Sequence, residues 1–151
     1  MITASEFITA VSTAIADDQI LKDWCMDQFE AEPVVYEGDP DEAVTPSIAI
    51  LGVVGFGRAH GKREAGHQLI IGYAVENDER VESGNRRIYT GLHQVETMRE
   101  LAENAVFRAG ITGGVAVEHA QDPDIRYPMF VSYSIIGITQ LKSTRRPLPD
   151  N

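Results

Sequence analysis

Two apolar runs separated by a glycine-rich stretch restrict the fold of this chain more than any other feature. Residues 47–54 (SIAILGVV) and 67–75 (HQLIIGYAV) are rich in β-branched and large apolar side chains, which is typical of β-strands. The twelve residues between them, 55–66, include four glycines and three basic side chains. Because glycine at this density marks turns and loops, the sequence predicts two strands joined by a long hairpin arm.

A capping signal near the start of the chain predicts a helix before these strands. Thr3 and Glu6 have the spacing of a capping box, in which each side chain bonds the backbone N–H of the other residue. Apolar residues then recur at helical intervals through residues 4–30. Asp17 and Asp18 favour a break and a second N-cap inside this segment.

The second half of the chain predicts another helix followed by strands. Residues 76–85 are polar and are predicted to form a loop. Thr90 is predicted to cap a long helix that stops at Gly110, because glycine commonly follows the last helical turn. Residues 115–119 and 129–139 then have strand composition and predict a closing hairpin.

This order of elements predicts an α+β fold. Residues 33–36 favour a further short strand, and residues 37–46 favour an acidic loop. Strands that follow one another by hairpins imply a mostly antiparallel sheet with two main helices packed on one face and a long hairpin arm. The 151 residues have the size of one domain, which we assign to residues 1–141, followed by an extended C-terminal tail at 142–151.

Both faces of the predicted sheet carry apolar side chains. In the last strand, Val131, Tyr133 and Ile135 alternate with two serines and with Phe130 and Ile136. We assign the first three residues to the core, which leaves Phe130 and Ile136 on the opposite side. Apolar area left in water usually marks an interface, so the sequence predicts self-assembly through the open side of the sheet.

Negative charge is concentrated in the first third of the chain. The net charge is −10, and residues 1–47 supply all of it with eleven acidic side chains and one basic side chain. This segment is either a solvated helix and loop, or a surface that repels an anion or docks a basic partner. The acidic surface residues that we single out are Glu37, Asp39, Asp41 and Glu42. The basic side chains form two small groups, Arg58, Lys62 and Arg63 in the arm and Lys142, Arg145 and Arg146 in the tail.

The charge balance and the short apolar runs argue against several classes of protein. An acidic chain without a dense basic cluster is not expected to bind nucleic acid as its main task. The longest uncharged runs are shorter than the roughly 20 residues that a membrane helix needs. No positive charge precedes the first apolar residues, unlike in a secretory signal, and a single cysteine favours a reducing compartment. We therefore expect a soluble cytoplasmic protein without a membrane partner.

No motif in the sequence predicts catalysis or a bound cofactor. Gly52 and Gly57 have the spacing of a phosphate-binding loop, but an arginine follows where that motif requires lysine. Cys25 is predicted to be an inert thiol on the apolar side of a helix. The histidines lack the spacing of a zinc site. These histidines are His60, His67, His93 and His119.

Three glutamates near one arginine form the remaining chemical candidate. Glu96, Glu100 and Glu103 recur on one face of the second predicted helix, with Arg99 beside them. Carboxylates at this spacing can bind a metal or transfer protons, but a solvated helix face explains them more simply. We therefore expect no catalytic residue, no metal and no cofactor.

The layout of the whole chain resembles that of the tail terminator, or tail completion, proteins of long-tailed bacteriophages and the related neck proteins. An N-terminal helix leads to an acidic turn, a long hairpin, one long helix and a final strand. The segments that carry the resemblance are PSIAILGVV (46–54), QLIIGYAV (68–75), HQVETMRELAENAVFRAG (93–110) and YPMFVSYSIIGITQL (127–141).

The resemblance implies a structural virion protein without catalytic residues. Such subunits assemble, usually as hexamers, into a ring that caps the tail tube and joins it to the head connector. The expected partners are copies of the chain itself, the tail tube protein, head–tail connector or neck proteins, and the sheath protein if the tail is contractile. The expected location is the tail or neck of the virion, after assembly in the host cytoplasm. The arm at 55–66 and the tail at 142–151 match stretches that bridge subunits in this family.

DNA would pass through such a ring without specific binding, because an acidic wall gives no counterion release. Two other classes of function stay open. Another tube or connector subunit of a virion would polymerise into filaments, whereas a terminator stops at a closed ring. A small-molecule enzyme would use His60, His67 and Glu64, and its metal content or stabilisation by ligands would reveal it.

Overall fold

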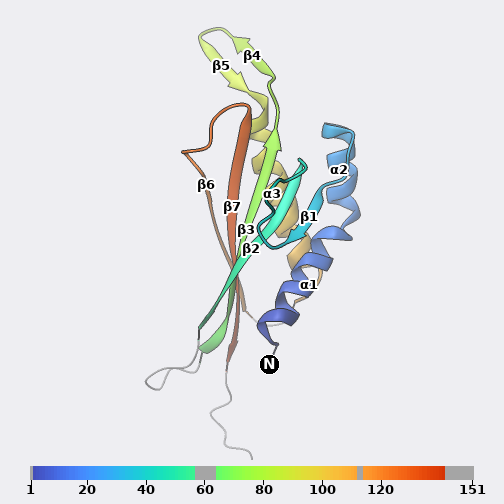
Figure 1. Ribbon diagram of the computed structural model, residues 1–151, viewed down its shortest axis with the longest axis vertical. Coiled ribbons are helices and arrows are strands. Elements are labelled where there is room, and N and C mark those ends of the chain that lie inside the picture. Colours follow the sequence, from blue (N-terminus) through green and yellow to red (C-terminus); the bar gives the residue numbers. More distant parts are fainter. Residues whose placement is uncertain (1, 57–63, 112–113, 142–151) are drawn as a thin grey trace, which may run out of the picture.

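The computed structural model describes residues 2–56, 64–111 and 114–141, and Figure 1 shows how these residues are arranged. Two helices come first, strands and a third helix follow, and two strands close the described chain. In chain order the elements are α1 (Ala4–Ala16), α2 (Gln19–Phe29), β1 (Val34–Glu37), β2 (Ser47–Phe56), β3 (Glu64–Glu76), β4 (Arg80–Ser83), β5 (Arg86–Tyr89), α3 (Thr90–Arg108), β6 (Gly114–Gln121) and β7 (Met129–Leu141). The predicted α+β class is confirmed.

Five of the strands form one mixed sheet. Their order across the sheet is β1-β2-β3-β7-β6; β1 and β2 are parallel, and all other neighbours are antiparallel. The predicted, mostly antiparallel sheet is therefore confirmed. Strands β4 and β5 form a separate two-stranded sheet that projects from one end of the molecule (Figure 1). Among the described helices, none is long and apolar enough to cross a membrane.

Side-chain caps define the first two helices, as the sequence predicts. Thr3 Oγ1 accepts a hydrogen bond from the Glu6 N–H at 3.1 Å, and Glu6 Oε1 accepts one from the Thr3 N–H at 3.0 Å. Asp18 caps the next helix by accepting a hydrogen bond from the Leu21 N–H at 2.9 Å. The segment 4–30 therefore forms α1 and α2, separated at the two aspartates.

Helix α3 begins differently from the prediction. Thr90 is the first residue of the helix and not its cap, and its hydroxyl donates to Glu79 Oε1 at 2.6 Å. The strand β5 runs directly into the helix, so its last residue, Tyr89, takes the N-cap position, and its side chain makes no capping hydrogen bond. The end agrees with the prediction, since Gly110 has a left-handed φ of 68° and Ile111 packs against the core.

The prediction of a loop over 76–85 is wrong for residues 80–83, which form β4, whereas residues 77–79 are irregular and 84–85 form a turn. Residues 80–83 pair with residues 86–89 to form the β4–β5 hairpin. All four residues of β4 are exposed, so the strand lacks the alternation of apolar and polar residues by which a sequence reveals a strand.

The predicted hairpin arm is shorter than its glycine content indicates. Strand β2 extends to Phe56 and β3 begins at Glu64, with Gly55 opposite His67 in the ladder. Backbone hydrogen bonds of a ladder require no side chains, so the glycine-rich ends of the arm continue the strands. The basic residues of the arm and tail lie outside the described residues, namely Arg58, Lys62, Arg63, Lys142, Arg145 and Arg146.

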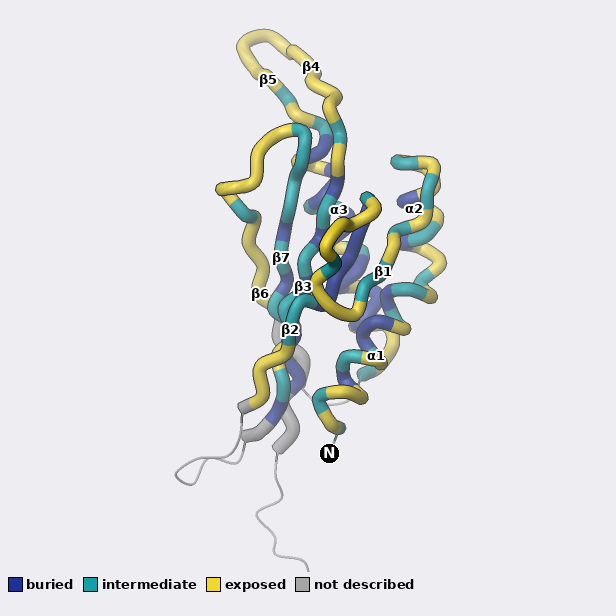
Figure 2. The backbone as a smooth tube through the Cα atoms, viewed as in Figure 1, coloured by how far each residue is buried: buried dark blue, intermediate teal, exposed yellow. Residues whose placement is uncertain are grey.

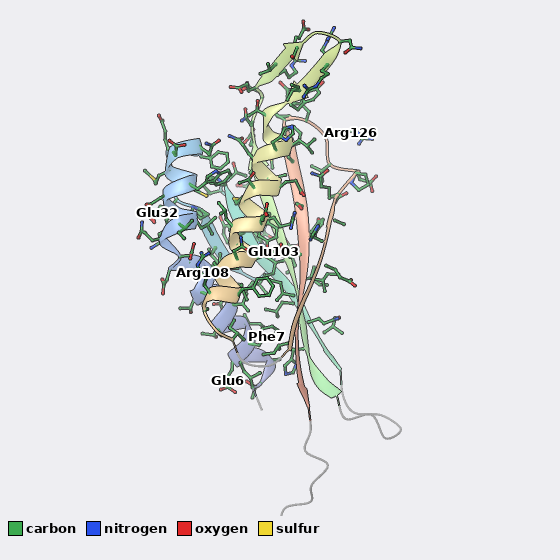
Figure 3. All side chains as sticks on the ribbon, turned by 180° about the vertical axis from the view of Figure 1, so that it is seen from behind. Glu6, Phe7, Glu32, Glu103, Arg108 and Arg126 are labelled. Atoms are coloured by element: carbon green, nitrogen blue, oxygen red, sulfur yellow. The ribbon has the colours of Figure 1, made fainter. Side chains whose placement is uncertain are left out.

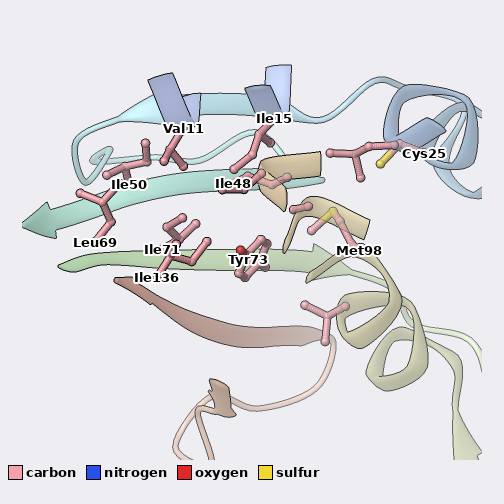
Figure 4. Close-up of a cluster of buried hydrophobic side chains, with 14 of the residues drawn as sticks. Val11, Ile15, Cys25, Ile48, Ile50, Leu69, Ile71, Tyr73, Met98 and Ile136 are labelled. Atoms are coloured by element: carbon pink, nitrogen blue, oxygen red, sulfur yellow. The ribbon is translucent and has the colours of Figure 1, made fainter. Parts of the chain in front are cut away.

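The three described helices all contribute to one apolar core on one face of the sheet. Figure 4 shows core side chains gathered between the helices and strands β2, β3 and β7, and Figure 2 shows buried segments in the middle of the molecule and exposed ones at its ends. The largest fully buried side chains are Tyr73, Phe7, Ile15, Leu21, Ile48, Leu69, Ile71, Met98, Ile136, Ile138, Val11 and Val75.

Strand β7 turns toward the core the side opposite to the one that the sequence predicts. Ser134 and Ile136 are fully buried beneath the helices. Val131, Tyr133 and Ile135 are half-buried on the other face. The apolar pattern of β7 predicts the wrong inner face because Ser134 is buried through a hydrogen bond to Glu103 of α3. That partner is distant in the sequence.

Gly91 near the start of α3 packs against the ring of Phe130, where a Cβ atom would overlap the ring carbons. We therefore expect Gly91→Ala to destabilise the protein by about 1–3 kcal/mol through overpacking, although alanine normally favours a helix over glycine. Urea unfolding measures the effect. The matched control is Gly91→Ala in a Phe130→Ala background, where the alanine should be neutral or stabilising. A more stable Gly91→Ala single variant would contradict the prediction.

Candidate functional site

A buried ionic cluster joins α3 to the sheet. Arg99 Nη1 donates to Glu103 Oε1 at 2.8 Å, and the two side chains are 8% and 10% exposed. Glu103 Oε2 accepts a hydrogen bond from Ser134 Oγ of β7 at 2.6 Å. Arg99 Nη2 also donates to Glu96 Oε1 at 3.0 Å. Figure 3, viewed from behind, shows α3 lying over the strands with Glu103 along it.

This cluster corrects the prediction of a solvated helix face. Of the three glutamates, Glu100 is exposed, Glu96 is half-buried and Glu103 is buried. An i,i+4 ion pair has the same sequence spacing on either face of a helix. The contact with Ser134 on β7 and the burial of Arg99 distinguish this buried ion pair from one on a solvated face.

The opposite charges in the cluster offset the free-energy cost of burying one another. Burial alone would raise the pKa of Glu96, but the nearby polar groups of Ser132 and Gln121 and the hydrogen bond and charge of Arg99 hold it below its usual value. A carboxyl whose pKa is lower in the folded chain stabilises the fold above its unfolded pKa, and this contribution is lost as the pH falls through the folded pKa. Burial would likewise lower the pKa of Arg99, but the two carboxylates raise it. The cluster therefore positions α3 on the sheet.

Of the other titratable candidates, His119 approaches the ionic cluster, with its Nδ1 3.9 Å from Glu103 Oε2 and its side chain 52% exposed. His67 Nε2 lies 3.2 Å from the carbonyl oxygen of Ile2, while His60 and the side chain of Glu64 lie outside the described residues. Cys25 is buried, and burial raises the pKa of its thiol to about 12, which suits an inert thiol. Within the described part of the chain, no group of three or more His, Cys, Asp or Glu side chains is arranged to hold a metal ion.

The face of the sheet opposite the helices carries a row of apolar side chains. We call this surface the open face, because no described helix covers it (Figure 1). Its side chains come from the three central strands, β2, β3 and β7, and most are half-buried. The members of the open face are Ala49, Leu51, Ile70, Gly72, Ala74, Val131, Tyr133 and Ile135.

The open face contains a small groove. Ala49, Gly72 and Ala74 are small residues in its lining, and Leu51 and Tyr133 are larger ones. Residues of the 38–46 segment, including an aspartate, line it as well. The groove has a volume of ≈ 210 Å³, smaller than the roughly 300–1,000 Å³ of ordinary small-molecule pockets. A single side chain of a partner suits this space better than a metabolite.

Carboxylates surround the polar end of the groove. The Tyr133 hydroxyl donates to Asp122 Oδ2 at 3.3 Å. Burial raises the pKa of this hydroxyl, and the negative charges of Asp122 and Asp39 raise it further. An apolar groove with a negative rim favours an occupant that combines an aliphatic side chain with a positive charge.

The acidic surface residues predicted from the sequence are all exposed. Glu37 ends β1, and Asp39, Asp41 and Glu42 follow it in the 38–46 segment. Asp39 alone among them lines the groove. Asp122 carries no signal in the sequence, because only the antiparallel pairing of β6 with β7 brings its turn beside Tyr133.

Comparison with known proteins gives no relative from which a function follows: no family model matches the chain, and no curated protein is significantly similar to it in sequence.

Removing one member of the buried ionic cluster should be costly. Glu103→Ala leaves Arg99 charged and poorly paired under α3, so we expect a loss of about 3–5 kcal/mol in the free energy of unfolding. Glu100→Ala, an exposed change one turn away on the same helix, should alter it by less than about 0.5 kcal/mol. Denaturant unfolding of the two variants compares these costs directly. Similar losses in both would show that the cluster does not hold α3 in place.

Proposed function

We propose that this chain is a structural subunit that assembles with copies of itself through its open face. The observation that carries the proposal is the row of apolar side chains on β2, β3 and β7 that no described helix covers. Large contiguous apolar patches on soluble proteins mark interaction sites. Covering this surface with a second copy contributes roughly 25 cal/mol for each Å² of apolar area removed from water.

The assembly that we propose is a closed ring of the tail-terminator kind, without catalytic residues. The support for this choice is the layout of the elements, in which a helical segment, a long hairpin, one long helix and a closing hairpin follow one another. In this role the ring caps a tail tube and joins it to a head connector or neck protein. Six copies are expected, and the resemblance alone supplies that number.

A closed ring also suits the charge of the chain. The acidic residues Glu37, Asp41 and Glu42 are exposed, and a wall of like charge lets DNA pass without binding. A contact between two different surfaces of the same chain repeats until the rotation closes the ring. The same contact without closure gives a filament, which is the behaviour of a tube subunit.

Assembly through the open face can be tested with one substitution and its matched control. Ile70→Asp places a charge on the open face and should weaken self-association while the chain stays folded. Ile20→Asp makes the same change on α2, where Ile20 is 53% exposed, and should leave association unchanged. Light scattering coupled to size exclusion gives the mass of each variant, and negative-stain images distinguish rings from filaments. An unaltered chain that stays monomeric at high concentration and with its tail tube would overturn the proposal.

The proposed channel predicts weak binding to DNA. At physiological salt the isolated protein should bind duplex DNA with a Kd at or above roughly 10⁻⁴ M, the weak end of non-specific binding. The triple variant Glu37→Gln, Asp41→Asn, Glu42→Gln removes three negative charges outside the groove and should bind DNA more tightly. Fluorescence anisotropy measures both. Nanomolar binding by the unaltered chain would contradict a passive channel wall.

A further inference from the structure

The β4–β5 hairpin is the part of the described chain with the fewest contacts to the rest of the molecule. Its two strands pair only with each other, and all of its residues except Ile88 are exposed. Figures 1 and 2 show it projecting beyond the helices and the main sheet. Because an isolated two-stranded hairpin is at best marginally stable in water, a second surface that covers it would stabilise it.

The base of the hairpin is nevertheless firmly held. The ring of Tyr89 lies 5.3 Å from that of Tyr127 and 6.5 Å from that of Phe130, measured between centroids. The guanidinium carbon of Arg80 lies 5.2 Å from the centre of the Tyr127 ring. The Tyr127 hydroxyl donates to the carbonyl of Asp78 at 2.7 Å. These contacts fix the direction in which the hairpin projects.

The hairpin combines aliphatic side chains with positive charge. Val81 lies opposite Ile88 in the ladder, and Arg86 lies opposite Ser83. Since opposite residues share a face and alternate positions point the same way, Val81, Ile88 and Arg86 lie on one face of the hairpin. Val81 is 44% exposed. Arg87 pairs with Glu82 at 3.3 Å, but both side chains are more than half exposed, so this pair is weak.

The groove on the open face has the complementary character. Ala49, Gly72 and Ala74 leave space for an aliphatic side chain, and Asp39 contributes a carboxylate to the lining. Asp122 at the rim accepts a hydrogen bond from the Tyr133 hydroxyl. Because that hydroxyl is neutral, the carboxylate of Asp122 can still pair with an arginine. The groove and the hairpin belong to different parts of the same chain.

We propose that the β4–β5 hairpin of one copy docks in the open-face groove of the next copy. In this contact, Val81 enters the apolar part of the groove, Ile88 packs against the apolar side chains beside it, and Arg86 approaches Asp39 and Asp122. The inference rests on the proposed self-assembly and names the element that makes the contact. Because two different surfaces of the chain meet, each copy offers a hairpin to one neighbour and a groove to the other.

Charge exchange tests the contact in the full-length protein. Arg86→Glu should weaken self-association about tenfold or more, and so should Asp39→Arg, because each places like charges together. Both changes in one chain should restore most of the association. The matched controls are Lys22→Glu and Glu100→Lys, which reverse charges on the helical side of the molecule. Association that is insensitive to both reversals, or that the combination does not restore, would overturn the contact.

Cross-linking separates failure of this contact from failure of the ring. Copies carrying Arg86→Cys are mixed with copies carrying Asp39→Cys, both in a Cys25→Ser background, and a short bis-maleimide joins cysteines that lie close together. We expect a dimer from this pair and none from Arg86→Cys mixed with Glu100→Cys. Rings that form without the cross-link would support the proposed ring and refute the hairpin contact. Cross-linked open chains would support the contact and refute the ring, and monomers without cross-links would refute both.

Discussion

The contact between α3 and β7 decides the rest of the architecture. Arg99 and Glu103 are buried on the inner side of α3, and Ser134 of β7 donates to the same carboxylate. A buried ion pair adds little net stability compared with an apolar pair, but it is costly to separate from its partners. Any shift of β7 by one residue would move Ser134 to the other face of the sheet. The ionic cluster therefore fixes which side of β7 faces the helices.

The choice of inner face determines what the other face exposes. With the serines turned inward, Val131, Tyr133 and Ile135 lie on the side that the described helices do not cover. The 38–46 segment reaches only part of that side, where its residues line the groove together with Leu51 and Tyr133. The polar contact inside the molecule and the apolar surface outside it are thus two consequences of one strand orientation.

The sequence alone predicts the elements that local interactions determine. The capping box of Thr3 and Glu6 and the cap at Asp18 depend on residues three apart, so they are visible in the sequence, as are the apolar strands and the α+β order. The fully exposed β4 has no such pattern. The burial of Glu103 depends on Ser134, which lies 31 residues away. Most of the fold could therefore be predicted, whereas the groove and the projecting hairpin could not, because tertiary pairing creates both.

A contact between copies that closes a ring needs a fixed geometry as well as affinity. Successive copies must be related by nearly the same rotation, because a contact that can pivot gives open chains of variable curvature. A hairpin that joined the body through a single flexible residue would not meet this requirement. In this chain, ring contacts among Tyr89, Tyr127 and Phe130 tie the base of the hairpin to the start of β7. The groove is lined by residues of the same strand, Val131 and Tyr133. One strand thus carries both the support of the hairpin and a wall of the groove, which keeps the angle between the two docking surfaces constant from copy to copy.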